Sequence, residues 1–158
     1  MAAILTPDPD AILLIRRADR SGDPWSGHIA LPGGRRDASD PDLVATAIRE
    51  TGEELGIQLT REDLIGSLDD VVPRTPVLPP IAVRPYVFML KARPAVMPND
   101  EVASAQWVTI DYLLRPDTHH PVRLDVGGQS RQVQAYQVED GIVWGMTERI
   151  LSGLIAHF

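Results

Sequence analysis

The chain has 158 residues, of which 44% are hydrophobic and 23% are charged, and its formal net charge is −7. This size predicts one domain, spanning residues 1–158, around a single core. Because so acidic a chain lacks the basic surface that displaces counterions, we do not expect tight binding to a long nucleic acid. The absence of cysteine excludes disulfides, a thiol nucleophile and thiolate metal ligands.

The sequence carries no sign of a membrane or secretory destination. No apolar run approaches the length of a membrane span, and the first residues lack the basic and apolar regions of a signal peptide. A chain without cysteine also fits a reducing compartment. We therefore expect a cytoplasmic protein with no membrane partner. A homodimer is compatible with the predicted sheet edges and apolar loops.

The first predicted elements are short strands separated by loops. The apolar run Ala11–Ile15 predicts a strand, and Arg20–Gly27 contains Gly, Pro and Ser and predicts a loop. Within this loop, Trp25 either covers the edge of the core or faces a ligand. His28–Leu31 is a second short strand, which leads into the turn Gly33-Gly34.

A helix is predicted between Asp40 and Gly56. Asp40 is a suitable N-cap, Pro41 suits the first helical position, and Gly56 is a natural terminator. One face of this helix is mostly apolar, so that it can pack on a sheet, and comprises Val44, Ala47, Ile48, Thr51 and Leu55. The other face is left for a cleft or for solvent.

That second face carries three carboxylates. Glu50, Glu53 and Glu54 are related as i, i+3 and i+4, so their side chains lie on the same side of a helix. Most charge runs are solvated helix faces, but such a cluster also suits a hard divalent cation that takes oxygen ligands. Arg49, four residues before Glu53, is placed to orient the acids, and a backbone carbonyl of the Gly33-Gly34 turn could be a fourth ligand.

Further strands and one loop are predicted after this helix. The loop Val71–Pro80 is rich in proline and is expected to lie over the cleft. The predicted strands are Leu64–Asp70, Ile81–Leu90 and Ala105–Val108. The last part of the chain predicts one helical turn at Asp111–Leu114, a hairpin of Val122–Val126 with Gln132–Val138, and a final helix capped by Thr147. This order suits a mixed sheet covered by helices.

Several residues outside the acidic helix are further site candidates. Glu101 could act as a base or an additional metal ligand, and a solvated loop acid is an equally good interpretation. Asp69-Asp70 is a weaker candidate at the end of a strand. His119-His120 is best interpreted as a solvated loop, because adjacent residues of a strand point to opposite faces. Trp144-Gly145-Met146 favours core or helix entry over a base-stacking platform.

The segment from Gly34 to Ile57 resembles the Nudix box, which is a glycine followed by an acid and then by Arg-Glu, two variable residues, Glu-Glu, a variable residue, Gly and an aliphatic residue. The resemblance implies an α/β/α sandwich with a mixed central sheet, a bound Mg²⁺ or Mn²⁺, and hydrolysis of a nucleoside diphosphate linked to another group. The implied metal ligands are Glu50, Glu53, Glu54 and the carbonyl of Gly34, oriented by Arg49. The chain departs from the pattern in having one extra residue between the early acid, Asp40, and Arg49.

The segments Leu13–Ala18 and Gly27–Gly34 resemble the upstream signature of the coenzyme A pyrophosphatase branch of this family. The branch cleaves coenzyme A to 3′,5′-ADP and 4′-phosphopantetheine. Ile15 and Leu31 depart from its usual residues, so ADP-ribose, a dinucleotide or a damaged nucleoside triphosphate remain alternative substrates. A noncatalytic nucleotide-binding module is the alternative of another class. The arginines expected to contact a phosphorylated substrate are Arg16, Arg17, Arg35 and Arg74.

Overall fold

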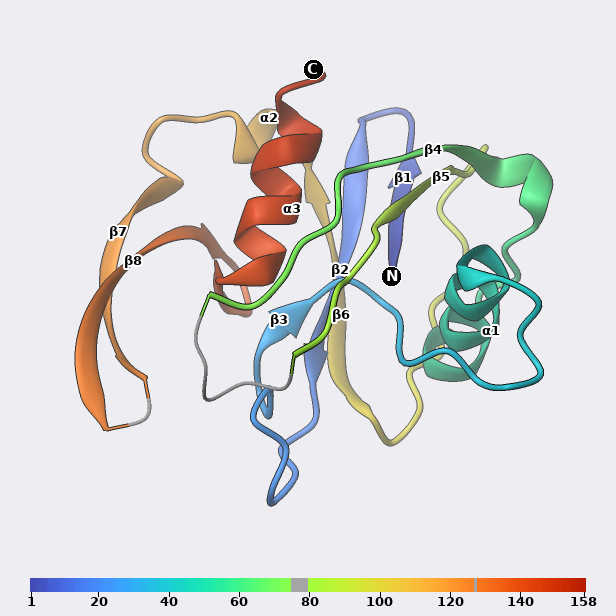
Figure 1. The fold of residues 1–158 in the computed structure, drawn as a ribbon. Helices are drawn as coiled ribbons and strands as arrows, with labels where there is room; N and C mark the ends of the chain where they lie inside the picture. Colours follow the sequence, from blue (N-terminus) through green and yellow to red (C-terminus); the bar gives the residue numbers. More distant parts are fainter. Residues whose placement is uncertain (75–79, 127) are drawn as a thin grey trace.

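A computed structural model describes residues 1–74, 80–126 and 128–158 (Figure 1). Its larger sheet has the strand order β3-β2-β1-β5-β4, and β6 pairs with β2. The bounds of these strands are β1 Ala2–Thr6, β2 Ala11–Arg17, β3 Ile29–Ala30, β4 Leu64–Ser67, β5 Tyr86–Met89 and β6 Val102–Thr109. A second sheet comprises β7 His119–Val126, β8 Gln129–Val138 and β9 Gly141–Trp144. The helices are α1 Leu43–Leu55, α2 Ile110–Leu113 and α3 Met146–Ile155, with a 3₁₀ turn at Arg61–Asp63.

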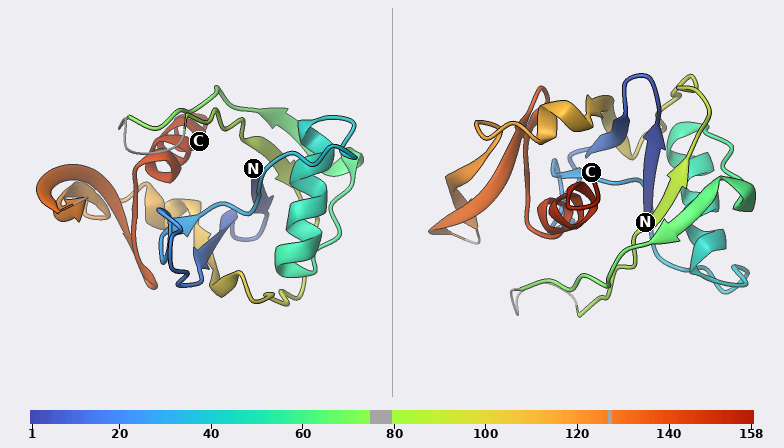
Figure 2. Two further views of the ribbon diagram at one scale, coloured as in Figure 1. Left: turned by 60° about the horizontal axis from the view of Figure 1, so that its bottom comes forward. Right: turned by 90° about the horizontal axis from the view of Figure 1, so that it is seen from above.

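The central strands are apolar on both faces because helices cover both faces. In β2, Leu13 and Ile15 pack in one core cluster with Val44 and Leu55 of α1. The alternate residues Ile12 and Leu14 pack in a second cluster with the apolar residues of α3, namely Ile150, Leu151 and Leu154. This alternation follows from the two-residue period of a strand. Helices α1 and α3 therefore lie on opposite sides of the sheet, as Figures 1 and 2 show.

The sheet is mixed because β1 pairs in parallel with β5 and antiparallel with β2. The predicted α/β/α sandwich with a mixed central sheet is confirmed. The predicted hairpin is also present, since β7 pairs antiparallel with β8 along its whole length. No helix in the described part of the chain is long and apolar enough to cross a membrane.

Several predicted strand boundaries were wrong. The strand expected at Ile81–Leu90 is regular only in β5, because Pro85 has no N–H to donate and the preceding segment makes a single bridge, Val71 to Val83. The strand expected at Leu64–Asp70 ends with β4 at Ser67. Residues 75–79 of the predicted proline-rich loop lie outside the described residues. Strand β1 was not predicted, although its five residues are all buried.

The predicted starts of α1 and α3 were also wrong. The N-cap of α1 is Asp42, whose carboxylate accepts a hydrogen bond from the backbone N–H of Ala45 at 2.8 Å. Asp40 is instead buried, and Pro41 precedes the cap. Helix α3 begins at Met146 after Gly145, not at a Thr147 cap. The predicted end of α1 is correct, since Gly56 has a φ of 68° and its N–H bonds to the carbonyl of Gly52.

Candidate active site

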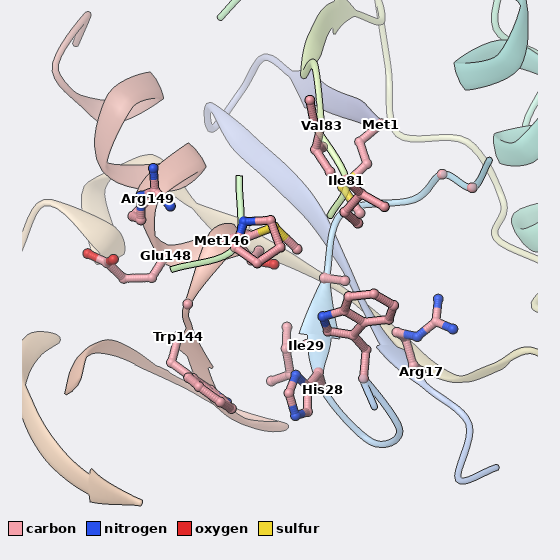
Figure 3. A pocket seen from close by; sticks show the side chains of 18 of the residues that line it. Met1, Arg17, His28, Ile29, Ile81, Val83, Trp144, Met146, Glu148 and Arg149 are labelled. Atoms are coloured by element: carbon pink, nitrogen blue, oxygen red, sulfur yellow. The ribbon is translucent and has the colours of Figure 1, made fainter. Parts of the chain in front are cut away.

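A cavity of about 930 Å³ lies beside α1 and extends to the start of α3. Glu50 and Glu54 line it at the end near α1, together with the Gly33-Gly34 turn. Trp144 and the first residues of α3 line the opposite end (Figure 3). Pockets of this volume hold small organic ligands, so the cavity is large enough for a nucleotide derivative.

The three box glutamates differ in burial. Glu54 is buried, and one of its carboxylate oxygens accepts a hydrogen bond from the N–H of Gly33 at 2.8 Å. The carboxylate of Glu50 packs so closely on Gly34 that a Cβ at that position would overlap it. Glu53 is more than half exposed. The turn and the helix are therefore in direct contact, in the second half of the helix and not at its start, where the glycines had predicted the approach.

Arg49 is the residue that holds this acidic face together. Its guanidinium pairs with Glu50 and with Glu53, each at 2.9 Å, and it donates two hydrogen bonds to Asp40 at 3.0 and 3.1 Å. It also donates to the backbone carbonyl of Arg35 at 3.2 Å. The planar fork of arginine donors suits several acceptors at once, so Arg49 fixes the carboxylates relative to the turn.

The acids respond in opposite directions to these surroundings. The pKa of Glu54 is raised to about 7, chiefly by burial; the hydrogen bond from Gly33 opposes the change, and the nearby charge of Glu50 contributes to it. The pKa of Asp40 is well below its usual range, because Arg49 and the backbone N–H of Asp37 donate to its carboxylate. Asp40 is therefore a fixed anion that positions Arg49.

The residues at the α1 end fit a divalent cation. Their donors are carboxylate and carbonyl oxygens, which Mg²⁺ and Mn²⁺ prefer. The missing side chain of Gly34 keeps its backbone close to Glu50. Within the described residues, no group of three acidic, imidazole or thiol side chains is already arranged as a metal site. Glu50 and Glu53 are paired with Arg49 instead, and the ligand set stays a prediction.

Only some of the other predicted site residues line the cavity. Arg17, Arg35 and Arg74 line the same cavity, as does Glu101, whose carboxylate is half exposed and pairs with Arg20 at 3.2 Å. Arg16 is exposed and is not among the lining residues. The weaker candidate Asp69-Asp70 is also absent from the lining, and Asp70 pairs with Arg84 at 2.7 Å.

Of two interpretations of residues near the end of the chain, one was wrong and the other was correct in part. His119 is not in a solvated loop. It begins β7, stacks on Tyr136 with ring centroids 4.2 Å apart and contacts Glu148 at 2.9 Å. The interpretation of Trp144-Gly145-Met146 as core or helix entry is correct for helix entry, since α3 begins at Met146 after Gly145, but Trp144 is not a core residue. It ends β9, is only partly buried and lines the cavity. In the sequence, the local signal that the chain turns after Trp144 is the glycine that follows it.

An α/β/α sandwich whose helix brings a glutamate cluster against a Gly-Gly turn is the architecture of a Nudix-type hydrolase. Comparison with known proteins agrees. The NUDIX domain profile matches residues 1–126. The Nudix hydrolase NudL of Citrobacter koseri, itself uncharacterized, is 33% identical over 159 residues, covering 97% of this chain and 80% of that protein. The chain belongs to the Nudix hydrolase family and is an enzyme of that family.

Two further comparisons bear on its extent and fold. An uncharacterized protein of Schizosaccharomyces pombe is 39% identical over 119 residues, which are 72% of this chain and 36% of that protein. The chain thus spans about a third of that relative's length. The crystal structure of a MutT/nudix family protein from Enterococcus faecalis superimposes with a TM-score of 0.62 at 19% identity, covering 96% of this chain and 59% of that one. This likeness concerns the fold alone.

Proposed function

We propose that this chain hydrolyses the diphosphate linkage of a nucleoside diphosphate derivative with Mg²⁺ or Mn²⁺, and that coenzyme A is its substrate. The observation that carries the proposal is a single cavity in which Glu50 and Glu54 lie against the Gly33-Gly34 turn. Membership of the family supports the class of reaction. The resemblance of Leu13–Ala18 and Gly27–Gly34 to the coenzyme A branch supports the substrate.

The proposed roles follow from charge and position. Glu50, Glu53, Glu54 and the Gly34 carbonyl would hold the cation, and Arg49 sets the directions of Glu50 and Glu53. When bound, the cation neutralises diphosphate oxygens and makes a coordinated water more acidic. Glu101, at the wall of the same cavity, accepts the proton of the attacking water.

Positive side chains at the cavity would receive the phosphates. Arg17, Arg35 and Arg74 line it, and the buried Nε of Arg17 has no hydrogen-bonding partner among the described residues. A buried donor without a partner is costly, and a phosphate oxygen would satisfy it. We also propose that residues 1–158 act as one domain, because elements on both sides of the sheet contribute to this one cavity.

The test is a substrate panel with either metal, in which products are identified by mass. The panel contains coenzyme A, ADP-ribose, dinucleotides and oxidised nucleoside triphosphates. Release of 3′,5′-ADP and 4′-phosphopantetheine from coenzyme A is the expected result, and turnover should stop when EDTA removes the metal. Preferred turnover of another member would retain the reaction and replace the substrate. No turnover of any member, with metal binding intact, would favour the noncatalytic module.

A matched pair of variants tests the role of the box. Glu53→Gln should reduce turnover by roughly 100-fold or more, because a cation ligand loses its charge, and should leave the thermal midpoint nearly unchanged at this exposed position. Glu62→Gln, an exposed acid of the 3₁₀ turn, is the control and should keep the parent activity. Activity of Glu53→Gln near the parent level would show that the ligand assignment is wrong.

A further inference from the structure

Three aromatic side chains lie in the wall of the cavity. Trp25, His28 and Trp144 all line it, and all three are only partly buried. The chain contains three tryptophans, so two of them lie in this one cavity. Large aromatic side chains usually bury their faces in a core or an interface. Their placement at the wall of a cavity, and not in a core, indicates a ligand surface.

His28 and Trp144 form a pair across two sheets. His28 immediately precedes β3 and Trp144 ends β9, and these two strands pack against each other. Their ring centroids are 4.9 Å apart with an interplanar angle of 53°. Figure 3 shows both rings at the wall of the cavity. Burial lowers the pKa of His28, so its ring is neutral at pH 7 and resembles an uncharged aromatic surface.

The loop that carries Trp25 is held in place by Asp23 and Arg17. Asp23 accepts a hydrogen bond from the backbone N–H of Trp25 at 3.0 Å and pairs with Arg17 at 2.6 Å. Arg17 itself lines the cavity. Burial opposes ionisation of Asp23, but the hydrogen bonds from Arg17 and Trp25 outweigh it and lower the pKa of the carboxyl. The tryptophan is therefore held beside a cation before any ligand binds.

We propose that Trp144, His28 and Trp25 form the subsite that binds the nucleobase of the substrate. Stacking on aromatic faces is how proteins hold bases without reading a sequence, and the continuity of the cavity places this subsite and Glu50 around one bound molecule. Trp144 lies beyond the span matched by the NUDIX domain profile, whereas Trp25 and His28 lie within it, so the last part of the chain supplies one of the three aromatic side chains. The inference rests on the proposed function for its choice of a nucleotide as ligand.

Binding of reaction-product fragments tests the subsite without turnover. AMP, GMP, CMP and UMP are titrated against ribose 5-phosphate in Mg²⁺, by calorimetry and by quenching of tryptophan fluorescence. We expect at least one nucleotide to bind roughly 10-fold or more tightly than ribose 5-phosphate and to quench the emission. Trp144→Ala should weaken that nucleotide roughly 10- to 100-fold, and Trp144→Phe, which keeps a stacking face, by much less.

Trp107 supplies the matched control. It packs with the α1-side core and lies near Arg93, whose guanidinium is 5.8 Å from its ring centroid. Trp107→Phe should leave nucleotide affinity and quenching unchanged, while Trp144→Phe should remove much of the quenching. Thermal melts of each variant exclude a folding defect.

Three results would overturn the subsite. They are equal affinity for ribose 5-phosphate and every nucleotide, unchanged nucleotide affinity in folded Trp144→Ala, and loss of affinity in that variant for 4′-phosphopantetheine alone. The last result would show that this part of the cavity wall binds the aliphatic part of the substrate and not its base. Trp144-dependent nucleotide binding without any diphosphate turnover would keep the subsite and refute the proposed hydrolysis. Diphosphate turnover without Trp144-dependent nucleotide binding would keep the proposed hydrolysis and refute the subsite.

Discussion

At one end of the cavity the box glutamates come from a single helix, and at the other the aromatic side chains come from segments far apart in the chain. Glu50 and Glu54 share α1, and one arginine fixes the acidic face. Trp144 and His28 meet only because β9 packs on β3. The box end therefore depends on close polar contacts, whereas the aromatic end depends on how two sheets are joined. Substitutions at the box end should therefore reduce kcat, whereas substitutions at the aromatic end should change stability and nucleotide binding.

The largest effect is expected where the box end is most crowded. Gly34→Ala places a Cβ on the Glu50 carboxylate, so the acid must move away from the turn. A displacement of about 1 Å at a catalytic group costs roughly 100-fold in rate, and we expect a loss of kcat of that size. Gly66→Ala is the control, because its Cβ would meet nothing within 4 Å. Equal kcat values for the two variants would show that this contact is unimportant.

Arg49→Lys should have a smaller effect at the same end. Lysine keeps the charge but cannot contact Asp40, Glu50 and Glu53 at once. We expect kcat to fall roughly 10-fold, with a smaller change in KM, because the carboxylates lose their fixed directions. Arg61→Lys, at an exposed pair with Asp42, should retain the parent kinetics. A change in KM alone would indicate a direct contact of Arg49 with substrate.

This difference also explains what the sequence could predict. The spacing of Glu50, Glu53 and Glu54 is local information, and their shared helix face was predicted from it, while the approach of the turn to the helix was predicted from Gly33-Gly34. Asp40 was misassigned as the N-cap because its true partner, Arg49, lies nine residues away. Strand β1 has a buried apolar run like that of β2, and this signal could have identified it. Helix entry after Trp144 was predicted correctly, but its place in the cavity wall depends on packing between two sheets and has no local signal.

Alanine substitutions at two glycines in the last part of the chain should change the unfolding free energy in opposite directions. Gly145 links Trp144 to α3 at a φ of 72° and a ψ of −128°, so alanine there should cost about 1–3 kcal/mol of unfolding free energy. The same strain should weaken nucleotide binding a few-fold by shifting Trp144. Gly153 lies inside α3 with open space around it, and alanine there should stabilise the protein by up to about 1 kcal/mol. Chemical denaturation measures the unfolding free energy of both variants. Destabilisation by Gly153→Ala, without destabilisation by Gly145→Ala, would contradict the strain assigned to Gly145.

The smallest effect should be a pH dependence at the aromatic end. In the unfolded chain His28 titrates near its ordinary pKa of 6.5, and in the folded chain burial lowers that pKa, with Arg17 lowering it further and Asp23 opposing. As the pH falls below about 6.5, the unfolded chain binds more protons than the folded one, so stability decreases. Above that pH the contribution is constant.

His28→Gln should therefore reduce the fall of the thermal midpoint between about pH 7 and pH 5, relative to the parent chain. His157→Gln, at an exposed position near the end of the chain, is the control and should keep the parent's fall. Other groups titrate in this range, so the quantity compared is the difference between variants. If His28→Gln and the parent lose stability equally, the ring is already accessible to water in the folded protein, and the aromatic end is more open than its packing indicates.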